Sequence, residues 1–584
     1  MTQNPAWLAV AATTRSIPPG GSIVVSASID TQQAATLVPG DYTADASYRN
    51  SSTGQWTVLV HFVLTVQARS PTDGWTTFTP SADTRIVYVS SASGSDGNDG
   101  LSPSTPRRTI AAGKALLRNG RPDWLLLERG GTWDESLGQW MASGRSVSEP
   151  MLVSSYGSST ERPYLRTGSG DGVSALASGA SPPRLDHVAI VGLRFHANTY
   201  VGNGQPSGVA WLIPSSDLLI EDCLVQGYQI DVSVPGYGGR KQNVRIRRNV
   251  IVDAFATTGT VGHGIYLANC DDVLIEENVL DHNGWSETVP GALPTTFRHG
   301  IYIQGGSGTC TNVTVRGNIV SNSAAYGLHL RPGGVADDNL FLRNSIALSL
   351  GGGNEPNPGG VAAIARGNVI LDGKNIDSAN PRGWAIELAN MSSGTVSDNI
   401  IANQTLAGFP IAMNLYGTMN GLGVHDTQLA RNIVYNWGGS ISLQGNANQL
   451  SSIAFVDNDV CNLVSPSPLV DHANNASTAS LQSMGNAFYS SNAVGHWMRH
   501  GGADDSLAGW KSLVGDTTSV VLQPAAYPDP GRTVARYNQS LGGLATHAAF
   551  MAEARRQSKS FWRPEYTAQA VNAYVRAGFG VIMP

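Results

Sequence analysis

The chain has 584 residues, too many for one ordinary globular core, so we expect several domains or a repeat array. Charged residues make up 14% of the sequence, well below the roughly 25% typical of soluble proteins, and glycine is abundant at 67 residues. This composition favours an all-β protein of short strands and tight turns. The formal net charge of −6 argues against nucleic acid as a partner.

The sequence contains no apolar run of about 18 residues, so we expect no membrane span. The stretch from Met1 to Trp7 lacks the basic and apolar regions of a signal peptide. Either a leader has been removed, or the protein reaches its destination without one, as phage structural proteins do. We nevertheless expect an extracellular or surface location.

Residues 1–68 alternate apolar and polar side chains in short runs separated by turn signals, which predicts a small antiparallel β-sandwich. The stretches Ala6 to Val10, Ile17 to Gly21 and Leu37 to Ala44 resemble the bacterial BACON-like immunoglobulin-type domains. That resemblance implies a partnership with carbohydrate-active modules. A linker rich in Ser, Thr and Pro is expected over residues 69–84.

The next stretch contains a strand at Val87, a Gly/Asp loop, a helix-like segment from Arg107 to Arg118 and a strand starting at Trp124. This order resembles the opening of the pectate-lyase-like superfamily, which implies a capping helix at the end of a right-handed parallel β-helix. A capping helix would cover the open end of the core. The loop residues Asp96, Asn98 and Asp99 are also ordinary turn formers. Ca²⁺ is therefore possible there but not required, and we expect no metal in the functional site and no cofactor.

A motif of alternating apolar residues that ends in asparagine recurs between about residues 185 and 490, within a predicted β-helix domain of residues 85–500. It is clearest at Val244 to Asn249, Val273 to Asn278 and Val313 to Asn318, and Cys223 takes the asparagine position in one copy. Each repeat would be one coil of a solenoid, and the asparagines would form a ladder along it. The later expected ladder positions are Asn344, Asn368, Asn399, Asn432, Asn458 and Asn486.

Residues 501–584 contain helical patterns, and we expect this segment to cap or pack against the upper coils. The predicted fold is therefore all-β, a right-handed parallel β-helix with a small N-terminal β-sandwich and a short C-terminal helical cap.

When the coils are aligned, Gly264, Gly300 and Gly327 share one position. Strand alternation then predicts polar and aromatic side chains on one outer face. The first outward stripe is Asp231, Tyr266, Tyr302, His329, Ser349, Glu387, Asn414 and Ser442. A second stripe holds Ala268, Gln304 and Arg331, and His263, His299 and Tyr326 come just before the strands.

A long, shallow groove with aromatic rings and hydrogen-bonding groups suits an extended sugar chain, so we expect a polysaccharide as the partner. Lyases that cleave uronate polymers neutralise the substrate carboxylate and need a base and a proton donor. Arg331 or Gln304 could neutralise, His299 or His329 could act as base, and Tyr302 or Tyr266 as proton donor. We expect His299, Tyr302, His329 and Arg331 to be catalytic. The predicted substrate-binding residues are His263, Tyr266, Gln304, Tyr326, Trp285, Asp231 and Glu387.

The competing chemistry is hydrolysis by two carboxylates about 5 to 9 Å apart. The candidate acids are Asp231, Asp253, Asp271, Asp272, Asp281, Glu287 and Glu387. Asp271-Asp272 and Gly262-His263-Gly264 resemble parts of the polygalacturonase pattern, but the histidine precedes the acids here, whereas it follows them in that family. A third possibility is a glycan-binding or structural spike without turnover. The sequence gives no sign of an oligomeric state.

Two insertions are longer than a coil needs, and long solenoid insertions tend to lie on the binding face. The loop from Asp281 to Phe297 contains Trp285, and Gly351 to Gly360 could form the opposite wall. Cys270 and Cys310 each stand three residues before a repeat valine, which allows either a disulfide or two stacked buried thiols.

Overall fold

The chain divides into two compact units in a computed structural model, Met1–Thr79 with Met583–Pro584, and Pro80–Ile582. The structure describes residues 8–10, 27–29, 40–49, 56–66, 74–176, 183–236, 239–259, 261–305, 309–352, 359–404, 410–419, 423–439, 441–446, 448–472 and 481–581.

In the first unit, the described strands form two antiparallel pairs. Strand β1 (Leu8–Val10) pairs with β2 (Ala27–Ile29), and β3 (Gly40–Arg49) pairs with β4 (Trp56–Val66). Most of the remaining residues of the predicted sandwich lie outside the described residues. The BACON-like resemblance therefore stays a prediction.

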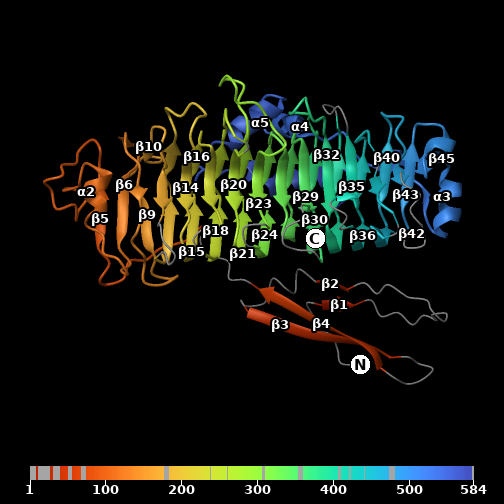
Figure 1. The fold of residues 1–584 in the computed structure, drawn as a ribbon, viewed down its shortest axis with the longest axis horizontal. Helices are drawn as coiled ribbons and strands as arrows, with labels where there is room; N and C mark the ends of the chain where they lie inside the picture. The colour runs from red at the N-terminus through yellow and green to blue at the C-terminus, as the bar shows by residue number, and fades with distance from the viewer. Residues whose placement is uncertain are drawn as a thin grey trace. The chain divides into compact units, whose positions relative to one another are not determined.

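The second unit contains a solenoid of three β-sheets, each with 14 strands (Figure 1). The chain passes through the first, second and third sheets in turn, and each strand pairs in parallel with the strand of the next coil. The hairpin of the last two third-sheet strands is antiparallel.

The first sheet consists of β5 (Ile86–Val89), β6 (Trp124–Glu128), β9 (Met151–Tyr156), β12 (Val188–Val191), β15 (Ser215–Glu221), β18 (Lys241–Arg247), β21 (Cys270–Glu276), β24 (Thr311–Arg316), β27 (Gly334–Asp337), β30 (Val361–Arg366), β33 (Met391–Ser397), β36 (Val424–Ala430), β39 (Leu450–Val456) and β42 (Leu481–Met484). The second sheet consists of β7 (Thr132–Trp133), β10 (Tyr164–Arg166), β13 (Arg194–His196), β16 (Leu224–Gln226), β19 (Val250–Val252), β22 (Val279–Asp281), β25 (Ile319–Ser321), β28 (Leu340–Leu342), β31 (Val369–Leu371), β34 (Ile400–Ala402), β37 (Ile433–Tyr435), β40 (Asp459–Asn462), β43 (Ala487–Ser490) and β46 (Val520–Val521). The third sheet consists of β8 (Gly138–Gln139), β11 (Val173–Ala175), β14 (Ser207–Trp211), β17 (Ile230–Val234), β20 (His263–Leu267), β23 (His299–Ile303), β26 (Tyr326–Leu330), β29 (Ile346–Gly351), β32 (Trp384–Ala389), β35 (Ile411–Tyr416), β38 (Ile441–Gln444), β41 (Val470–His472), β44 (Met498–His500) and β45 (Ala503–Asp505).

Apolar side chains from all three sheets fill the interior of the solenoid. In the first sheet Val244, Val273 and Val313 pair in register and are at most 2% exposed. One coil alone would leave its apolar side open to water, and stacking joins these sides into one continuous core.

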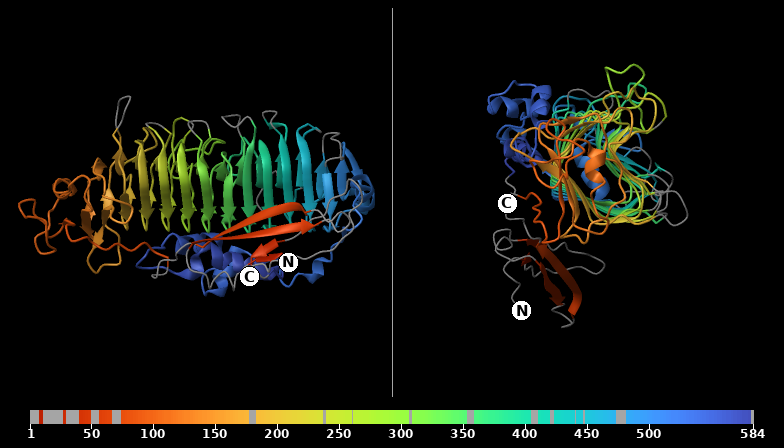
Figure 2. Two further views of the ribbon diagram at one scale, coloured as in Figure 1. Left: turned by 90° about the horizontal axis from the view of Figure 1, so that it is seen from below. Right: turned by 90° about the vertical axis from the view of Figure 1, so that its left-hand side faces the viewer.

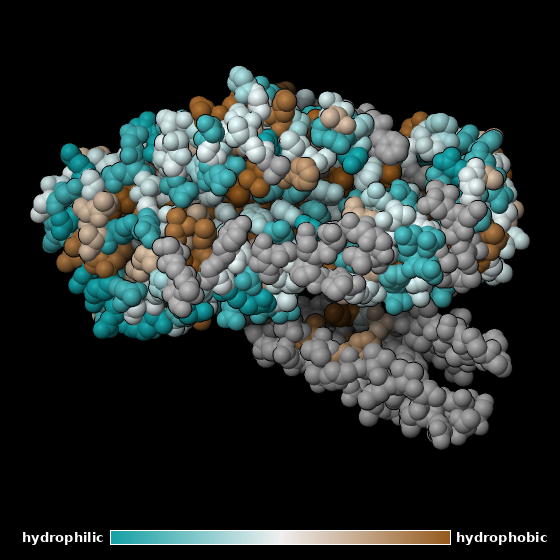
Figure 3. Space-filling model, in the orientation of Figure 1, coloured by the Kyte–Doolittle hydropathy of each residue, from teal (hydrophilic) through white to brown (hydrophobic). Residues whose placement is uncertain are grey.

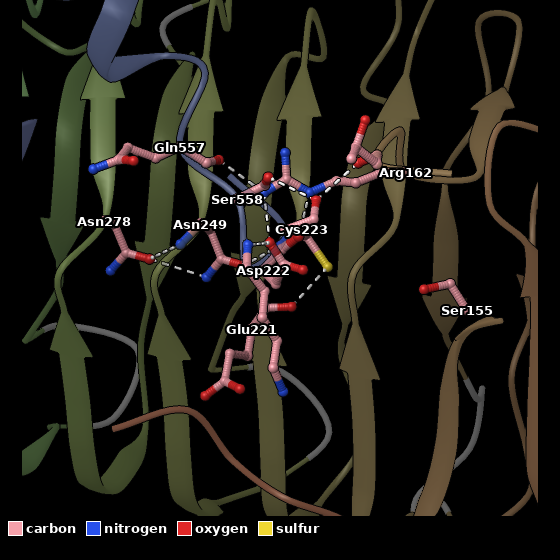
Figure 4. Close-up of polar contacts among 12 residues, drawn as sticks. Ser155, Arg162, Glu221, Asp222, Cys223, Asn249, Asn278, Gln557 and Ser558 are labelled. Atoms are coloured by element: carbon pink, nitrogen blue, oxygen red, sulfur yellow. Dashed lines mark hydrogen bonds and ion pairs between the residues drawn. The ribbon is translucent and has the colours of Figure 1, made fainter. Parts of the chain in front are cut away.

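An asparagine ladder runs along the turn between the first and second sheets. Asn278 Oδ1 accepts hydrogen bonds from the backbone and side-chain N–H groups of Asn249, at 3.0 and 2.9 Å. Cys223 ends the ladder by donating its backbone N–H to Asn249 Oδ1 at 2.9 Å (Figure 4). The ladder pairs buried polar groups that would otherwise lack partners. Its members are Asn249, Asn278, Asn318, Asn339, Asn368, Asn399, Asn432, Asn458 and Asn486.

One predicted ladder position is wrong. Asn339, not Asn344, occupies it, and its backbone N–H donates to Asn368 Oδ1 at 3.0 Å. The coil that contains β27 is short, so its ladder position comes only 21 residues after Asn318. Asn344 lies at the next turn, from the second to the third sheet, where its Oδ1 accepts the Ser323 N–H at 3.0 Å.

Short helices cover both ends of the solenoid core. Helix α2 (Ile110–Lys114) is capped by Thr109 and buries Ile110 at the first coil (Figure 2, right). It is shorter than the predicted segment from Arg107 to Arg118. Helix α3 (Leu507–Val514) follows the last coils and packs Leu507 and Trp510 into the core.

The other helices among the described residues pack along the outer face of the second sheet (Figure 2). They are α4 (Val534–Ser540), α5 (His547–Ala554) and α6 (Ala568–Gly578), with the short 3-10 turns η4 (Pro524–Ala526) and η5 (Pro564–Tyr566); a third turn, η3 (Val494–His496), precedes β44. Their apolar side chains cover outward-facing residues of the second sheet such as Val250, Ile319 and Leu371.

Polar contacts tie this C-terminal segment to coils well below the upper ones. The Lys559 N–H donates to Asp222 Oδ1 at 2.8 Å, and Arg162 donates to the Gln557 carbonyl at 2.9 Å (Figure 4). Arg555 pairs with Asp253 at 2.9 Å and with Asp281 at 2.7 Å. The segment therefore covers the middle of the flank as well as the upper coils.

Hydrophilic and hydrophobic side chains are interspersed on the face of the protein shown in Figure 3. Among the described residues, no helix is long and apolar enough to cross a membrane.

Candidate functional site: the outer face of the third sheet

The third sheet presents two outward rows of rings because its strands contain two successive inward positions. The first of these is occupied by Gly264, Gly300 and Gly327. A Cβ at Gly300 would lie 2.5 Å from Ser323 Oγ and 3.1 Å from the Val320 side chain, so this position points into the solenoid. The next residue of each strand is a buried Ile or Leu, which also points inward.

Strict alternation is thus broken, and the residues on both sides of this inward pair face outward. Row A contains His263, His299 and Tyr326, and row B contains Tyr266, Tyr302 and His329. The register confirms the predicted alignment of Tyr266, Tyr302 and His329. We call these six residues the aromatic cluster.

The rings of the aromatic cluster contact one another across three neighbouring strands. The ring centroids of His263 and His299 are 5.1 Å apart, those of His299 and Tyr302 are 4.7 Å apart, and those of Tyr302 and His329 are 5.4 Å apart. Tyr326 stacks on His329 at 4.3 Å. Such pairs stabilise by about 0.5–1.5 kcal/mol each beyond their burial.

Arg331 links row B to the second outward stripe. Its Nη1 donates to the Tyr302 hydroxyl oxygen at 2.6 Å, and its Nε donates to the Gly352 carbonyl at 3.1 Å. A negative charge that develops on the Tyr302 oxygen would face a guanidinium. In the neighbouring coil the Tyr266 hydroxyl donates to Gln304 Oε1.

The histidines of the cluster are held neutral. Burial, aided by the Arg298 guanidinium, lowers the pKa of His263 to about 3. Burial and the charge of Arg331 lower the pKa of His329 to about 3. Burial and the neighbouring His263 and His329 hold the pKa of His299 well below its ordinary value. At neutral pH each ring therefore has one nitrogen that can accept a proton or hydrogen bond.

His263 and His299 lie deeper in the cluster than His329. They are 1% and 4% exposed, and His263 Nδ1 accepts the backbone N–H of His299 at 3.2 Å. His329, Tyr302 and Arg331 are half-buried and so have direct access to solvent.

Glu387 continues row B two strands beyond His329, through Ser349. Its side chain is 1% exposed and accepts hydrogen bonds from Ser349 Oγ at 2.8 Å and from the Tyr326 hydroxyl at 3.5 Å. Burial raises the pKa of Glu387. The next residue of the row, Asn414, is fully buried, and its side-chain amide has no hydrogen-bond partner among the described residues.

Asp231 does not belong to this row, contrary to the prediction. The register pairs Ser233 with Tyr266, so Asp231 falls at the inward glycine position. Its carboxyl is fully buried and accepts the Tyr228 N–H at 3.3 Å, and burial raises its pKa well above the ordinary value. The sequence alignment missed the extra inward residue.

Trp285 lies beside residues of the turn that leads from the second to the third sheet. Its Nε1 donates to the Asn322 carbonyl at 2.9 Å, and its ring lies 4.5 Å from the His282 ring. Lys374 Nζ lies 5.6 Å from the Trp285 ring. None of these contacts is with the aromatic cluster, so the role of Trp285 as a binding wall stays a prediction. Most of the second predicted wall, Gly351 to Gly360, lies outside the described residues.

The other candidate acids have partners outside the aromatic cluster. Asp253 and Asp281 pair with Arg555, and Glu287 pairs with His282 at 2.6 Å. On the first sheet, Thr311 donates to Asp271, and Arg245 pairs with Asp272 at 2.6 Å.

Sequence reasoning missed Trp384 and Arg382. Trp384 continues row A beyond Tyr326 and Ile346, and the Arg382 guanidinium lies 4.7 Å from its ring. A usable signal existed, because Trp384-Ala-Ile-Glu387 repeats the spacing of His299-Gly-Ile-Tyr302 with alanine at the small inward position.

The described residues contain no group of three or more His, Cys, Asp or Glu side chains placed to hold a metal ion. In the predicted cation loop, Asp96 accepts the N–H groups of Arg108 and Thr109, each at 2.9 Å. Cys270 and Cys310 are buried free thiols, and the Cys270 N–H donates to Cys310 Sγ at 3.4 Å. Of the two predicted alternatives, the structure has the stacked thiols.

A family model described as a right-handed β-helix region matches residues 211–346. These residues contain the whole aromatic cluster. This part of the chain is a right-handed parallel β-helix. A comparison with curated proteins finds no match.

Several solved structures resemble the chain at low identity. A mannuronic acid-specific polysaccharide family 6 lyase from human gut microbiota is 14% identical, with a TM-score of 0.41, and the match covers 79% of this chain and 95% of that one. The GH136 lacto-N-biosidase from Eubacterium ramulus is 12% identical, with a TM-score of 0.34 and coverage of 75% and 67%. Pectate lyase Pel9A is 11% identical, with a TM-score of 0.32 and coverage of 78% and 85%. At these values the likeness concerns the fold alone.

Proposed function

We propose that this protein degrades polysaccharide, and that it cleaves an acidic, uronate-containing polymer by β-elimination at the aromatic cluster. The observation that carries the proposal is the hydrogen bond of 2.6 Å from Arg331 to the Tyr302 hydroxyl. The His329 ring lies beside this pair, with its centroid 5.4 Å from that of the Tyr302 ring. A cation, a phenol and a neutral imidazole thus adjoin on half-buried positions of one face.

Each of these groups has a role in the elimination. Arg331 binds the uronate carboxylate, which acidifies the C–H next to it. His329 takes that proton, and the electron pair of the broken C–H bond forms a C=C bond as the glycosidic C–O bond breaks. Tyr302 donates its hydroxyl proton to the departing sugar oxygen, and Arg331 faces the resulting charge. Base and donor stand on adjacent strands, about 4.8 Å apart along the sheet.

Substrate binding would also prepare the base. Burial and the charge of Arg331 lower the pKa of His329 to about 3 in the free protein, which makes the ring a weak base. A substrate carboxylate on Arg331 offsets that charge, so the pKa of His329 rises when substrate is present. His299 is 4% exposed and packs against the Tyr302 ring, so it is less suited to reach a sugar carbon.

No added cofactor is part of the proposal, because Arg331 supplies the positive charge that elimination needs. We place the protein outside the cell or at a surface, where polymers of this kind occur.

Hydrolysis is the second candidate, and Glu387 favours it. A buried carboxyl with a raised pKa is suited to protonate a leaving oxygen. The next carboxylate along row B among the described residues is Asp471, three strands away, or about 14 Å. Hydrolases need their two carboxyl groups roughly 5 to 9.5 Å apart, so elimination is the better supported reaction.

The test measures products from a panel of acidic polysaccharides. Elimination yields new ultraviolet absorbance from an unsaturated uronate, and the Arg331→Ala and His329→Ala variants should each lose at least about 100-fold in rate. Arg499→Ala, on the same face at the far end of the sheet, serves as the control. New reducing ends without absorbance would support the hydrolase instead. Binding with neither product would support a glycan-binding spike, and normal turnover by both variants would refute this site.

A further inference from the structure

The outer face of the third sheet is poor in charge around the aromatic cluster. The seven strands β17, β20, β23, β26, β29, β32 and β35 present three outward rows. Row A runs through Ile230, His263, His299, Tyr326, Ile346, Trp384 and Ile411; row B through Ser233, Tyr266, Tyr302, His329, Ser349, Glu387 and Asn414; and the last row through Pro235, Ala268, Gln304, Arg331, Gly351, Ala389 and Tyr416.

Arg331 and Glu387 are the only ionisable side chains in these rows besides the histidines and tyrosines. Burial raises the pKa of Glu387, and burial lowers the pKa values of His263, His299 and His329, so these groups tend toward their neutral forms.

Cations at the edges of the rows add little. Arg382 lies against Trp384 at 4.7 Å. The Arg298 guanidinium is 3% exposed and donates to the carbonyls of Ala256 and Leu293, each at 2.7 Å. Arg499 pairs with Asp471 at 2.6 Å. At the turn beside Asn269, Arg240 pairs with Asp271 at 3.5 Å. Within the three rows themselves, positive charge for a bound polymer therefore comes from Arg331.

A homopolymer of uronate carries one negative charge on every sugar. Seven strands span about 29 Å from first to last. A polymer lying along them would bring several carboxylates against the neutral half-buried side chains there, such as Tyr266, Tyr302 and Gln304. A carboxylate taken from water without a partner costs several kcal/mol. Neutral sugars have no such cost, and their C–H faces can stack on the half-buried rings of Tyr266 and Tyr302.

We infer that the substrate is a heteropolysaccharide in which isolated uronates are separated by neutral sugars, with one carboxylate bound at Arg331. This inference rests on the proposed function, because it takes the aromatic cluster as the polysaccharide site. The neighbouring rings and amides then bind the flanking neutral sugars.

Binding of the full-length protein tests the inference separately from catalysis. Three probes are compared by affinity electrophoresis: polygalacturonate, with a uronate at every sugar; gellan and xanthan, with isolated glucuronates; and the carboxyl-reduced forms of the last two. We expect the polymers with isolated uronates to bind at least tenfold more tightly than polygalacturonate. Because few ions are released, log Kd should change with log salt with a slope of about one to two.

Two variants with the same loss of charge sharpen the test. Arg331→Gln should weaken binding of the isolated-uronate polymers by about 10- to 100-fold, the usual value of a hydrogen bond to a charged group, and should leave the carboxyl-reduced polymers unaffected. Arg499→Gln should change neither. Tighter binding of polygalacturonate, a salt slope of four or more, or no binding of the isolated-uronate polymers would overturn the inference. Ultraviolet absorbance in the same mixtures reports elimination independently, so failure to cleave would count against the proposed function alone.

Discussion

The outer faces of the second and third sheets are built from strands of the same solenoid, but their side chains meet different surroundings. On the second sheet the outward side chains are mostly Val, Ile and Leu, and α4, α5 and α6 cover them. On the third sheet they include the aromatic cluster, Arg331 and Glu387. Burial of apolar area explains the outer face of the second sheet. It does not explain why imidazoles, phenols and a guanidinium gather on the outer face of the third sheet.

One repeat can thus separate two tasks. The coils give the second sheet apolar side chains that add stability, and three neighbouring coils give the third sheet the aromatic cluster. Substitutions on the second-sheet face should therefore change stability, and substitutions on the third-sheet face should change activity.

The largest effect is expected from Tyr302→Phe. Loss of the proposed proton donor should lower kcat by about 100- to 10,000-fold, with little change in the thermal unfolding temperature. Tyr435→Phe, which removes a hydroxyl from the covered second-sheet face, should retain activity. If the two variants behave alike in the assay, the two faces are not functionally distinct.

The reverse pattern is expected for Phe550→Ala. Phe550 is fully buried between α5 and the second sheet, and its truncation should lower the free energy of unfolding by about 3–5 kcal/mol. Activity per folded molecule should stay unchanged. Denaturant titration measures this free energy. Leu544 is 75% exposed, so the control variant Leu544→Ala should change the free energy of unfolding by less than about 0.5 kcal/mol. A large loss of kcat in folded Phe550→Ala would contradict the separation.

A smaller effect is expected from pH. The folded protein holds the pKa of His263 at about 3, below the ordinary value of 6.5. Between these values the unfolded chain binds a proton that the folded chain does not, so stability is full above about pH 6.5 and falls as the pH drops toward 3. The slope is at most about 1.4 kcal/mol per pH unit for each such histidine. Unfolding titrations at pH 7 and pH 5 measure it, and His263→Gln should reduce it; equal stability of the wild type at both values would contradict the assignment.

The smallest effect is expected from Arg499→Gln. Arg499 pairs with Asp471 at the far end of the third sheet, and its side chain is 40% exposed. Pairs of this kind contribute about 0–1 kcal/mol, so the unfolding temperature should barely shift and the rate should match the wild type. A lost activity would extend the functional face to the last coils.

The solenoid itself was predictable because its repeat is local. The apolar alternation and the asparagine at Asn249, Asn278 and Asn318 fix both the coil and the register between coils. The short coil at β27 misled the alignment, since the apolar residues Leu340 to Leu342 precede Asn344 and imitate the repeat. The contacts of Arg555 and Lys559 with the middle coils could not be predicted, because they join residues that are far apart in the chain.

The candidate site was predictable to the extent that it repeats. His263, His299 and their partners recur with one spacing, so the alignment found them. The hydropathy pattern does not reveal that each strand has two successive inward residues. Asp231 was therefore predicted to face outward, whereas it occupies an inward position. The hydrogen bond between Tyr326 and Glu387 spans two coils and depends on side-chain direction, which a sequence pattern does not contain.

The register between coils also fixes the spacing of side chains along the third sheet. Tyr302 and Glu387 are three strands apart, about 14 Å, however many residues the intervening loops contain. Deleting one whole coil would shorten that distance by a single strand step, whereas lengthening a loop would leave it untouched. The spacing between side chains along this face can therefore change only in fixed increments, while the connecting loops can vary in length.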